Sequence, residues 1–369
     1  MKYFLIAGER SGDVYGANLI VALLKKDPAA QIVCYGGDEM KAAGGELLSH
    51  YKESAFMGFY EVFTNFRVIK KKLNTCKKEL LAFHPDAVIF IDYPGFNLRM
   101  AAFAKRHGLR TIYYISPKIW AWNKGRIKEI RSFVDKLLVI FPFEVPFYKS
   151  LNYPVEYVGN PLIEHIDSYE LDTSLKRSES HRWNIAFLPG SRKQEVEHSI
   201  EMISKLAHQR KDLFFWIAGV DNLPIDLYDS IIGLSNVRLV VGKTYEILNL
   251  CDAAIVTSGT ATLETALWNI PQVVCYKAHP ISYLIAKYLV QIKFISLVNL
   301  IVDKEIVKEL IQKDYTSENV LREVDLLLVD EKTKRKQLTD YQELNILLGQ
   351  KKASEIVVEK VYKLVTKPL

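Results

Sequence analysis

A carboxylate follows directly on a short, fully apolar run in the first half of the chain. Residues Ala87–Ile91 read Ala-Val-Ile-Phe-Ile and are followed by Asp92. Such a run is typical of a buried parallel strand, and ligands bind beyond the carboxyl ends of such strands. Partial burial would raise the proton affinity of this carboxyl group, as a general base for a hydroxyl requires. Residues Tyr93–Phe96 also suit a type II turn in which Asp92 only bonds backbone N–H groups, and spacing alone leaves both interpretations open.

Two turns in the second half combine glycine with residues that can bind phosphate. The strand expected at Ile185–Leu188 runs into Pro189–Arg192, and the apolar run Ala253–Val256 runs into Thr257–Glu264. A glycine allows close approach of the backbone, and the following helix offers unpaired N–H groups and a positive dipole end. The residues expected to contact a nucleotide diphosphate are Gly190, Ser191, Arg192 and Glu195 at the first turn and Ser258, Gly259, Thr260 and Thr262 at the second.

Each turn also has an interpretation without a ligand. The first could be an ordinary strand-to-helix connection with a solvated Arg192. At the second, Ser258 or Thr260 could cap the helix while Glu264 complements its dipole. With a ligand, Glu264 would lie about one turn into the helix and could accept hydrogen bonds from the two hydroxyls of a ribose. Two such turns in one domain favour a nucleotide diphosphate.

Missing motifs narrow the class of enzyme. The sequence lacks the GxxxxGK[ST] loop of P-loop NTPases, the GxSxG elbow of α/β-hydrolases and any Asp-x-Asp pair for a divalent metal. The opening loop Gly8–Asp13 connects a strand to a helix but does not match GxGxxG, so a nicotinamide enzyme is the weaker hypothesis. We expect neither a metal nor a cofactor. Helix ends and basic side chains would then stabilise a leaving diphosphate.

Short apolar runs alternate with amphipathic segments, the pattern of parallel sheets with crossover helices. The expected strands are Tyr3–Ala7, Ile32–Tyr35, Ala87–Ile91, Thr111–Ile115, Lys136–Ile140 and Glu156–Val158, then Ile185–Leu188, Leu213–Ala218, Val237–Val241, Ala253–Val256 and Gln272–Tyr276. The fold class is α/β with two Rossmann-like lobes, residues 1–168 and 183–345, joined by the polar stretch Glu170–Arg182. The active site is expected in the cleft between the lobes. The helical segment 346–369 would pack on the first lobe or on a partner in a homodimer.

The charge and the lengths of the apolar runs narrow the class of ligand and the cellular location. The 369 residues carry a formal charge of +6 with a pI near 8.8, which suits an anionic ligand or lipid surface and does not require nucleic acid. No motif that reads DNA or RNA is present. The apolar start Met1–Gly8 is too short for a signal peptide, and no run approaches the ~20 apolar residues of a membrane-spanning helix. These features predict a cytosolic protein.

Two segments are rich in aromatic surface. Residues 57–72 combine large apolar groups with a basic flank, which fits an interfacial helix on anionic lipid or a core helix with a solvated lysine end. The residues that would contact the membrane are Phe59, Phe63, Phe66, Arg67, Lys70 and Lys71. A second segment carries Trp120 and Trp122, which could be packing residues or could line an acyl or sugar pocket.

Taken in order, these segments resemble the lipid-A-disaccharide synthase family, inverting glycosyltransferases with the two-lobed GT-B fold. The opening loop Gly8–Asp13 and the segment Trp120–Trp122 are specific to that family, whereas Ser258–Glu264 is shared more widely. Further matching segments are Met57-Gly58, Ile91–Asn97, Pro142–Glu144, Val158–Pro161, Leu188–Glu195, Ser296–Leu300 and Glu309-Leu310.

The resemblance implies a reaction and roles for single residues. A diacylglucosamine unit would pass from its UDP carrier to diacylglucosamine 1-phosphate with inversion, giving a β-linked disaccharide phosphate and UDP. Both substrates are acylated, which implies peripheral attachment to the inner face of the bacterial inner membrane. Asp92 takes the position of the general base. The positions implied for UDP are Arg192, Ser258, Gly259, Thr260 and Glu264, with Asn299 along the same cleft, and those of the acceptor-side loop are Glu9, Ser11, Gly12 and Asp13.

The chain also departs from the family pattern. Gly95 stands where many relatives have a second Asp, so Asp92 is the only carboxylate candidate in its loop. Asn160 replaces a common His and Asn123 a common Arg, which weakens any role for charge there. Two other hypotheses stay open: another UDP-sugar enzyme of this fold, such as a UDP-N-acetylglucosamine epimerase or a peptidoglycan glycosyltransferase, and a non-enzymatic lipid-surface binding module.

Overall fold

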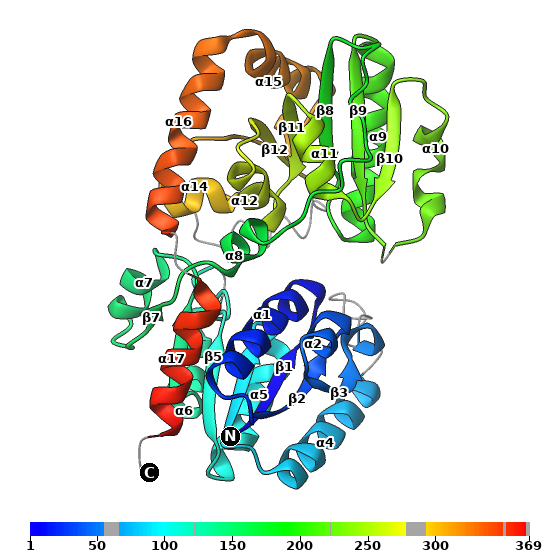
Figure 1. Cartoon of the computed structure of the whole chain (residues 1–369). Helices are drawn as coiled ribbons and strands as arrows, with labels where there is room; N and C mark the ends of the chain where they lie inside the picture. The colour runs from blue at the N-terminus through cyan, green and yellow to red at the C-terminus, as the bar shows by residue number, and fades with distance from the viewer. Residues whose placement is uncertain (55–65, 122, 222, 278–292, 350–351, 367–369) are drawn as a thin grey trace. The chain divides into compact units, whose positions relative to one another are not determined.

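The chain folds into two compact units, seen in a computed structural model that describes residues 1–54, 66–121, 123–221, 223–277, 293–349 and 352–366 (Figure 1). The first unit comprises Met1–Ser168 together with Leu348–Leu369, and the second comprises Tyr169–Leu347. Each unit is built around its own parallel sheet. The predicted α/β class is confirmed.

The first unit has a seven-stranded sheet in the order β3-β2-β1-β4-β5-β6-β7. Its strands are β1 Lys2–Ala7, β2 Gln31–Gly36, β3 Glu46–His50, β4 Ala87–Ile91, β5 Arg110–Tyr114, β6 Lys136–Val139 and β7 Glu156–Tyr157. Its helices are α1 Arg10–Lys26, α2 Asp38–Ala42, α4 Phe66–Phe83, α5 Pro94–Arg106, α6 Ile127–Phe133, α7 Glu144–Ser150, α8 Pro161–Asp167 and α17 Ala353–Val365, with short 3-10 turns η1 Tyr51–Ser54 and η2 Lys124–Arg126. Strand β4 and the Tyr3–Ala7 part of β1 are buried between the helical layers because their side chains are apolar or aromatic on both faces.

The second unit has a six-stranded sheet in the order β10-β9-β8-β11-β12-β13. Its strands are β8 Trp183–Leu188, β9 Leu213–Gly219, β10 Val237–Val241, β11 Ala253–Thr257, β12 Gln272–Tyr276 and β13 Lys308–Ile311. Its helices are α9 Lys193–Gln209, α10 Asp229–Ile232, α11 Thr244–Leu250, α12 Thr260–Leu267, α14 Leu297–Val302, α15 Ser317–Val329 and α16 Glu331–Leu348, with 3-10 turns η3 Ile225–Tyr228 and η4 Gln312–Asp314.

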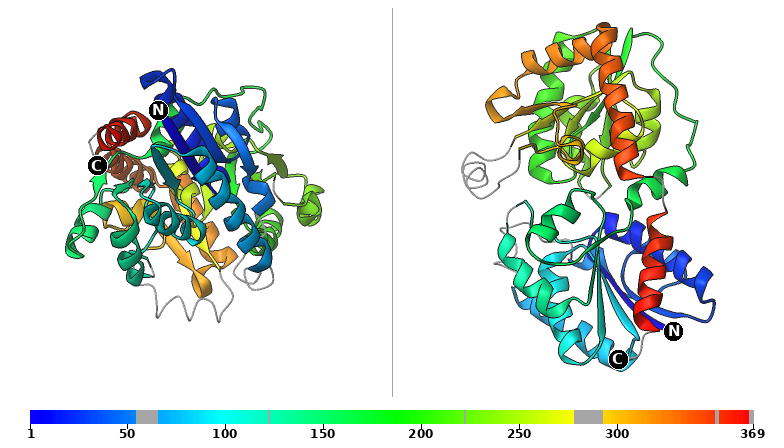
Figure 2. Two further views of the ribbon diagram at one scale, coloured as in Figure 1. Left: turned by 90° about the horizontal axis from the view of Figure 1, so that it is seen from below. Right: turned by 90° about the vertical axis from the view of Figure 1, so that its left-hand side faces the viewer.

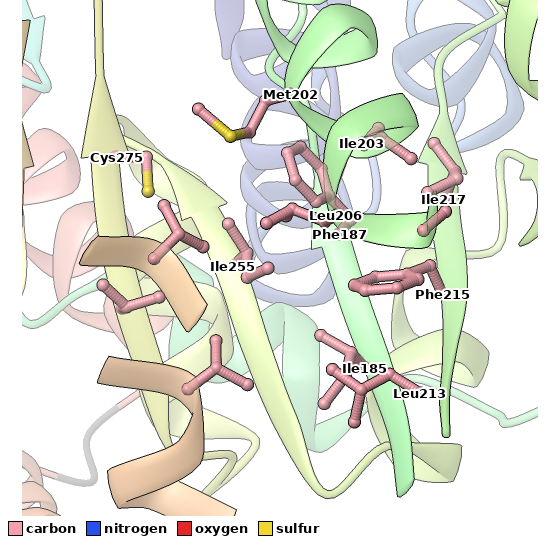
Figure 3. Packing of buried hydrophobic residues seen from close by; sticks show 14 of the residues in the cluster. Ile185, Phe187, Met202, Ile203, Leu206, Leu213, Phe215, Ile217, Ile255 and Cys275 are labelled. Carbon is pink, nitrogen blue, oxygen red and sulfur yellow. The ribbon is translucent and has the colours of Figure 1, made fainter. Parts of the chain in front are cut away.

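One face of the second sheet packs its apolar side chains against α9 and α15. Figure 3 shows Phe187 and Phe215 from neighbouring strands facing Ile203 and Leu206 of α9. Each of these four side chains is at most 1% exposed. Full burial of such a side chain is worth about 1.5–3 kcal/mol, so this layer holds the strands, and hence their carboxyl ends, in fixed register.

The C-terminal helix α17 belongs to the first unit. It contacts α1, α8 and β5, and it lies alongside them in both sets of views (Figures 1 and 2). The Glu164 carboxylate of α8 accepts a hydrogen bond from the backbone N–H of Ser354 at 3.0 Å and one from its hydroxyl, which fixes the start of α17. The hydroxyl of Tyr157 donates to the Leu348 carbonyl at 2.6 Å.

The polar stretch between the two sheets packs on the second unit. Arg177 forms a paired ion contact with both oxygens of Asp252, at 2.8 and 2.7 Å. Farther back, the Tyr169 hydroxyl donates to Glu246 at 2.8 Å. The residues before β8 are therefore held against the surface of this unit by charge-assisted contacts.

Three local features differ from the sequence prediction. Strands β3 and β13 were not expected; both are edge strands, and except for the buried Leu310 their side chains are exposed or only partly buried. The alternative of a type II turn at residues 93–96 is wrong, because helix α5 begins at Pro94. Proline is favoured in the first turn of a helix, where its missing N–H needs no partner. None of the helices in the described part of the chain has both the length and the apolar character needed to cross a bilayer.

Candidate active site

The first site candidate lies where the strand order of the first sheet reverses. Strand β1 pairs with β2 on one side and with β4 on the other, and Ala7 is opposite Ile91 at the carboxyl ends of the β1–β4 pair. In open α/β sheets this switch point leaves a crevice for a ligand. Glu9 follows β1 and Asp92 follows β4, so the topology brings two acidic residues 83 positions apart to one edge of the sheet.

A pocket of about 220 Å³ opens at this edge. Its lining residues all belong to the first unit: Glu9, Asp92, Tyr93, Pro94, Lys118, Ile119, Asn123 and Arg126. The pocket therefore combines two carboxylates with two cations, and its remaining walls are an aromatic ring, a proline, an isoleucine and an amide.

The backbone at Asp92 is held in an uncommon conformation. Asp92 and Tyr93 have φ angles of 45° and 50°, the left-handed region that L-residues rarely adopt. Such residues persist only where the surroundings fix them. The Asp92 carbonyl accepts hydrogen bonds from the Tyr113 hydroxyl at 2.7 Å and from Asn97 Nδ2 at 2.8 Å, while its N–H donates to the Tyr114 carbonyl at 3.1 Å. The carboxylate is thus presented on a rigid turn.

The environment makes the Asp92 carboxyl group more basic than usual. Its pKa is raised to about 6, mainly by burial; Lys118 lowers this pKa and Glu9 raises it. A group with this pKa is ionised in most molecules at neutral pH, yet it binds a proton more strongly than a solvated aspartate. These are the properties that a general base needs.

Two residues that the sequence analysis did not assign to the site hold this turn in place. Asn97 is completely buried, and its Nδ2 also lies 3.2 Å from the Ile6 carbonyl on β1 and 3.3 Å from the Ile91 carbonyl on β4. At Gly8 a Cβ atom would lie 2.2 Å from the ring of Tyr93, so only glycine leaves room for that ring. In the sequence, the one signal for this role of Gly8 was a glycine directly after an expected strand.

Some residues of the opening loop Gly8–Asp13 lie at the pocket, and others only support the fold. Glu9 lines the pocket, and the Ser11 hydroxyl donates to it at 3.0 Å. Gly12 lies inside α1, close to Ala7. Asp13 is 2% exposed, and its carboxylate accepts the N–H groups of Gly37 and Met40 at 2.6 and 3.1 Å. In this structure Asp13 fixes the start of α2 and is not among the pocket residues.

Trp120 lies beside the pocket, next to a buried acid. Its ring packs edge-on against Phe143 with centroids 5.0 Å apart. Glu144 is 1% exposed and accepts the N–H groups of Ile140 and Phe141 at 3.2 and 3.0 Å. Burial raises the pKa of Glu144 to about 7. The neighbouring Trp122 lies outside the described residues.

The second unit repeats the switch point between β8 and β11. These strands pair in parallel, with Leu188 opposite Val256. The two turns predicted to bind a diphosphate therefore leave adjacent strands at the same edge of this sheet. Figure 1 shows α9 and α12 following them.

The turn from β8 to α9 is closed by its own helix. Gly190 has a φ of 97°, and the carboxylate of Glu195 accepts the N–H groups of Ser191 and Arg192 at 3.2 and 3.3 Å. Arg192 also contacts Glu195 at 3.2 Å, although its side chain is 82% exposed. The Glu195 carboxylate therefore accepts the same backbone N–H groups that we expected to bind a phosphate.

The turn from β11 to α12 is different. The Ser258 hydroxyl donates to the Ile295 carbonyl at 2.9 Å and that of Thr262 to the Gly259 carbonyl at 2.8 Å. Gly259 and Thr260 are exposed, and no side chain caps the N-terminus of α12 among the described residues. Glu264 is half-buried one turn into the helix. Among the described residues, the start of α12 is therefore exposed and uncapped, and a helix N-terminus of this kind can bind an anion.

Asn299 is part of the scaffold around this turn. It is completely buried; its Oδ1 accepts the N–H groups of Ile306 and Val307 at 2.8 and 3.0 Å, and its Nδ2 donates to Val307 and Glu309 at 2.9 Å each. The Glu309 carboxylate also accepts the N–H of Ser296 at 3.0 Å. The network holds the segment to which Ser258 is bonded.

The predicted membrane contacts are only partly described. Phe59 and Phe63 lie outside the described residues, and Phe66 and Arg67 begin α4. Lys70 and Lys71 are exposed on that helix. Membrane contact by this segment stays a prediction.

Comparison with known proteins gives the family. The family model described as lipid-A-disaccharide synthetase matches residues 3–361. The lipid-A-disaccharide synthase of Geobacter metallireducens is 37% identical over 343 residues, which cover 89% of this chain and 88% of the relative. That of Coxiella burnetii is 34% identical over 373 residues and covers 98% of both chains.

Solved structures confirm the GT-B fold at low sequence identity. The UDP-GlcNAc 2-epimerase from Neisseria meningitidis, solved with UDP-GlcNAc, has a TM-score of 0.68 at 14% identity and covers 98% of this chain and 100% of its own. CalG4, the calicheamicin glycosyltransferase, has a TM-score of 0.62 at 15% identity and covers 99% of both chains. The fold is thus shared between epimerases and transferases, whereas the sequence match is specific: the chain belongs to the lipid-A-disaccharide synthase family, a family of hexosyltransferases.

Proposed function

We propose that this chain transfers diacylglucosamine from UDP-diacylglucosamine to diacylglucosamine 1-phosphate, with Asp92 as the general base. The family implies a UDP-sugar donor and a sugar-phosphate acceptor. The acyl chains, the roles of single residues and work at the inner face of the inner membrane are the proposed part. The exposed lysines Lys70 and Lys71 on α4 are consistent with an anionic lipid surface.

The observation that carries the proposal is the basic carboxylate on a rigid turn at the switch point. Asp92 would accept the proton of the acceptor hydroxyl as its oxygen attacks the anomeric carbon from the face opposite the leaving group. The new carbon–oxygen bond forms while the bond to the diphosphate breaks, and UDP leaves with the electron pair. Inversion at the anomeric carbon follows from this single displacement.

In the second unit, the open N-terminus of α12 is the best-supported place for the diphosphate. Its backbone N–H groups and dipole would stabilise the charge that develops on the leaving group. Ser258, Thr260 and Glu264 are the side chains best placed to complete this nucleotide site. Arg192 contacts Glu195 through Nη1, and the rest of its exposed guanidinium group could reach an anion.

The variant Asp92→Asn tests the proposal. It keeps the shape of the side chain but cannot accept the proton, so turnover should fall about 10²- to 10⁴-fold while UDP binding and the circular dichroism spectrum stay unchanged. UDP release from acylated donor and acceptor is the assay. Turnover near the wild-type rate would remove Asp92 from the mechanism.

The pH profile provides a second readout from the same protein. The base must be ionised, and its pKa is raised to about 6. We therefore expect kcat to fall about tenfold per pH unit below about pH 6 and to be level above it. The residual activity of Asp92→Asn should lack this acid limb. An identical limb in both proteins would assign the ionisation to another group.

A further inference from the structure

We propose that Lys118 and Arg126 bind the phosphate group of the sugar-phosphate acceptor, in the pocket that they line together with the two carboxylates. This inference rests on the proposed function and adds to it the group by which the acceptor is recognised. Neither cation follows from the family resemblance set out above.

The two kinds of charge in the pocket come from different parts of the chain. Glu9 and Asp92 follow the adjacent strands β1 and β4. Lys118 and Arg126 both belong to the segment between β5 and α6, and Asn123 of the same segment lies on the same pocket. The lining from the two strand ends is thus acidic (the acidic wall), and the lining from the loop before α6 carries two cations and an amide donor (the basic wall).

The basic wall is attached to the buried part of the unit. Ile119, next to Lys118, is 1% exposed, and its N–H donates to the Pro117 carbonyl at 2.6 Å. The Tyr148 hydroxyl, itself buried, contacts both Ser116 and the Pro117 carbonyl. At the other end, the Arg126 N–H donates to the Asn123 carbonyl at 3.2 Å. A wall fixed in this way can position a ligand and does not merely attract it.

The charges suit an acceptor that carries both a hydroxyl and a phosphate. A phosphate close to Glu9 and Asp92 alone would be repelled, and two cations offset that repulsion. A guanidinium can bind phosphate oxygens through two parallel hydrogen bonds, and an ammonium adds a compact charge. The same sugar ring would then present its hydroxyl to the acidic wall, where Asp92 accepts the proton.

The size of the pocket agrees with this division. Its volume of about 220 Å³ is below the ~300–1,000 Å³ of sites that enclose a whole drug-sized ligand. It can therefore enclose a phosphosugar head, while acyl chains would have to stay outside. The pocket would then recognise the charged head group, and the length of the acyl chains would be recognised by other surfaces.

Lys118 also lowers the pKa of Asp92. Loss of Lys118 could thus slow the reaction through the base alone, with no contact to phosphate. A comparison between acceptors with and without the phosphate separates the two effects, because only phosphate binding depends on that group. The pH profile of kcat also distinguishes the two effects, because a changed pKa of Asp92 would shift the pH below which kcat falls.

The experiment measures KM for diacylglucosamine 1-phosphate and for diacylglucosamine without phosphate, in the wild type and in Lys118→Ala, Arg126→Ala and the double variant. Lys149→Ala, an exposed cation on α7 outside the pocket lining, is the matched control. We expect each single variant to raise KM for the phosphorylated acceptor about tenfold and the double variant more, with KM for the other acceptor and for the donor unchanged. Lys118→Met and Arg126→Gln serve if an alanine variant fails to fold.

Three results would overturn the inference: an unchanged KM, an equal loss with both acceptors, or a rise confined to the donor. The last would move these cations to the donor diphosphate. Each of these results keeps UDP release by the wild type and its loss in Asp92→Asn, so the proposed function would survive. Absence of UDP release by the wild type, or full activity of Asp92→Asn, is instead a failure of the proposed function.

Discussion

The two strand-to-helix turns of the second unit look alike in sequence and differ in structure. Both follow buried strands, both contain glycine and hydroxyl residues, and both leave the same edge of the sheet. At the β8–α9 turn, Glu195 accepts the amides of Ser191 and Arg192. At the β11–α12 turn, no side chain takes the corresponding place among the described residues.

The difference separates two uses of glycine. Gly190 has a φ of 97°, and a Cβ there would lie 2.9 Å from Cβ of Glu195 and 2.5 Å from its Oε2. Gly259 has an extended φ of 165°, and a Cβ there would have no heavy atom of the described residues within 4 Å. The first glycine is required by the fold, whereas the second leaves space in front of a helix N-terminus. The proposed nucleotide would occupy that space.

The largest effect is expected from Gly190→Ala. The left-handed backbone costs a non-glycine residue about 1–3 kcal/mol, and the new methyl group must displace Glu195. The free energy of unfolding of the second unit should fall by about 2–4 kcal/mol, measured by urea denaturation. Gly259→Ala is the matched control and should unfold at the wild-type midpoint. Equal midpoints for both variants would contradict the contrast between the turns.

Gly259→Ala should instead impair nucleotide binding. Its methyl group would stand in the open space before α12, so the affinity for UDP should fall about 10- to 100-fold, which is about 1.4–2.7 kcal/mol. Isothermal titration calorimetry with UDP measures this change in the folded protein. An unchanged affinity would place the diphosphate away from this turn and would favour the β8–α9 turn after displacement of Glu195.

The smallest effect is expected from Ser258→Ala. Its hydroxyl donates to the Ile295 carbonyl at 2.9 Å, and loss of one such bond costs about 0.5–1.5 kcal/mol. The Glu309 carboxylate still accepts the N–H groups of Ile295 and Ser296, so the segment should stay in place. A loss of UDP affinity larger than the loss of stability would show that the hydroxyl changes partner when nucleotide binds. Equal losses of UDP affinity and stability would show that the Ser258 hydroxyl only supports the fold.

Apolar patterning predicted the buried strands of both sheets but not the strands β3 and β13. Strand β3 reads Glu-Leu-Leu-Ser-His and β13 reads Lys-Glu-Leu-Ile, and each contains polar residues with partly exposed side chains. A strand at the edge of a sheet is covered on fewer sides, so its sequence need not be uniformly apolar. What fixes such a strand is pairing with its neighbour, which no local pattern contains.

The candidate site was predictable at its strand ends and unpredictable in its loops. Asp92 follows an apolar run, so its place at the sheet edge could be inferred from the sequence. The pocket positions of Lys118 and Arg126 depend on how the chain after β5 folds back. Asp13 and Asn299 were predicted to contact ligands, but in the structure both are buried and bonded to groups of the protein itself. A polar residue of this kind cannot be distinguished by sequence from one that contacts a ligand.

The position of α17 has a consequence for how the protein is made. The surface formed by α1, α8 and β5 is synthesised early, but the helix that covers it comes after residue 352. During translation this surface must therefore stay uncovered until the residues of α17 have been synthesised and have left the ribosome. Chains cut short before this helix should therefore be prone to aggregation and degradation, even though they contain both sheets in full.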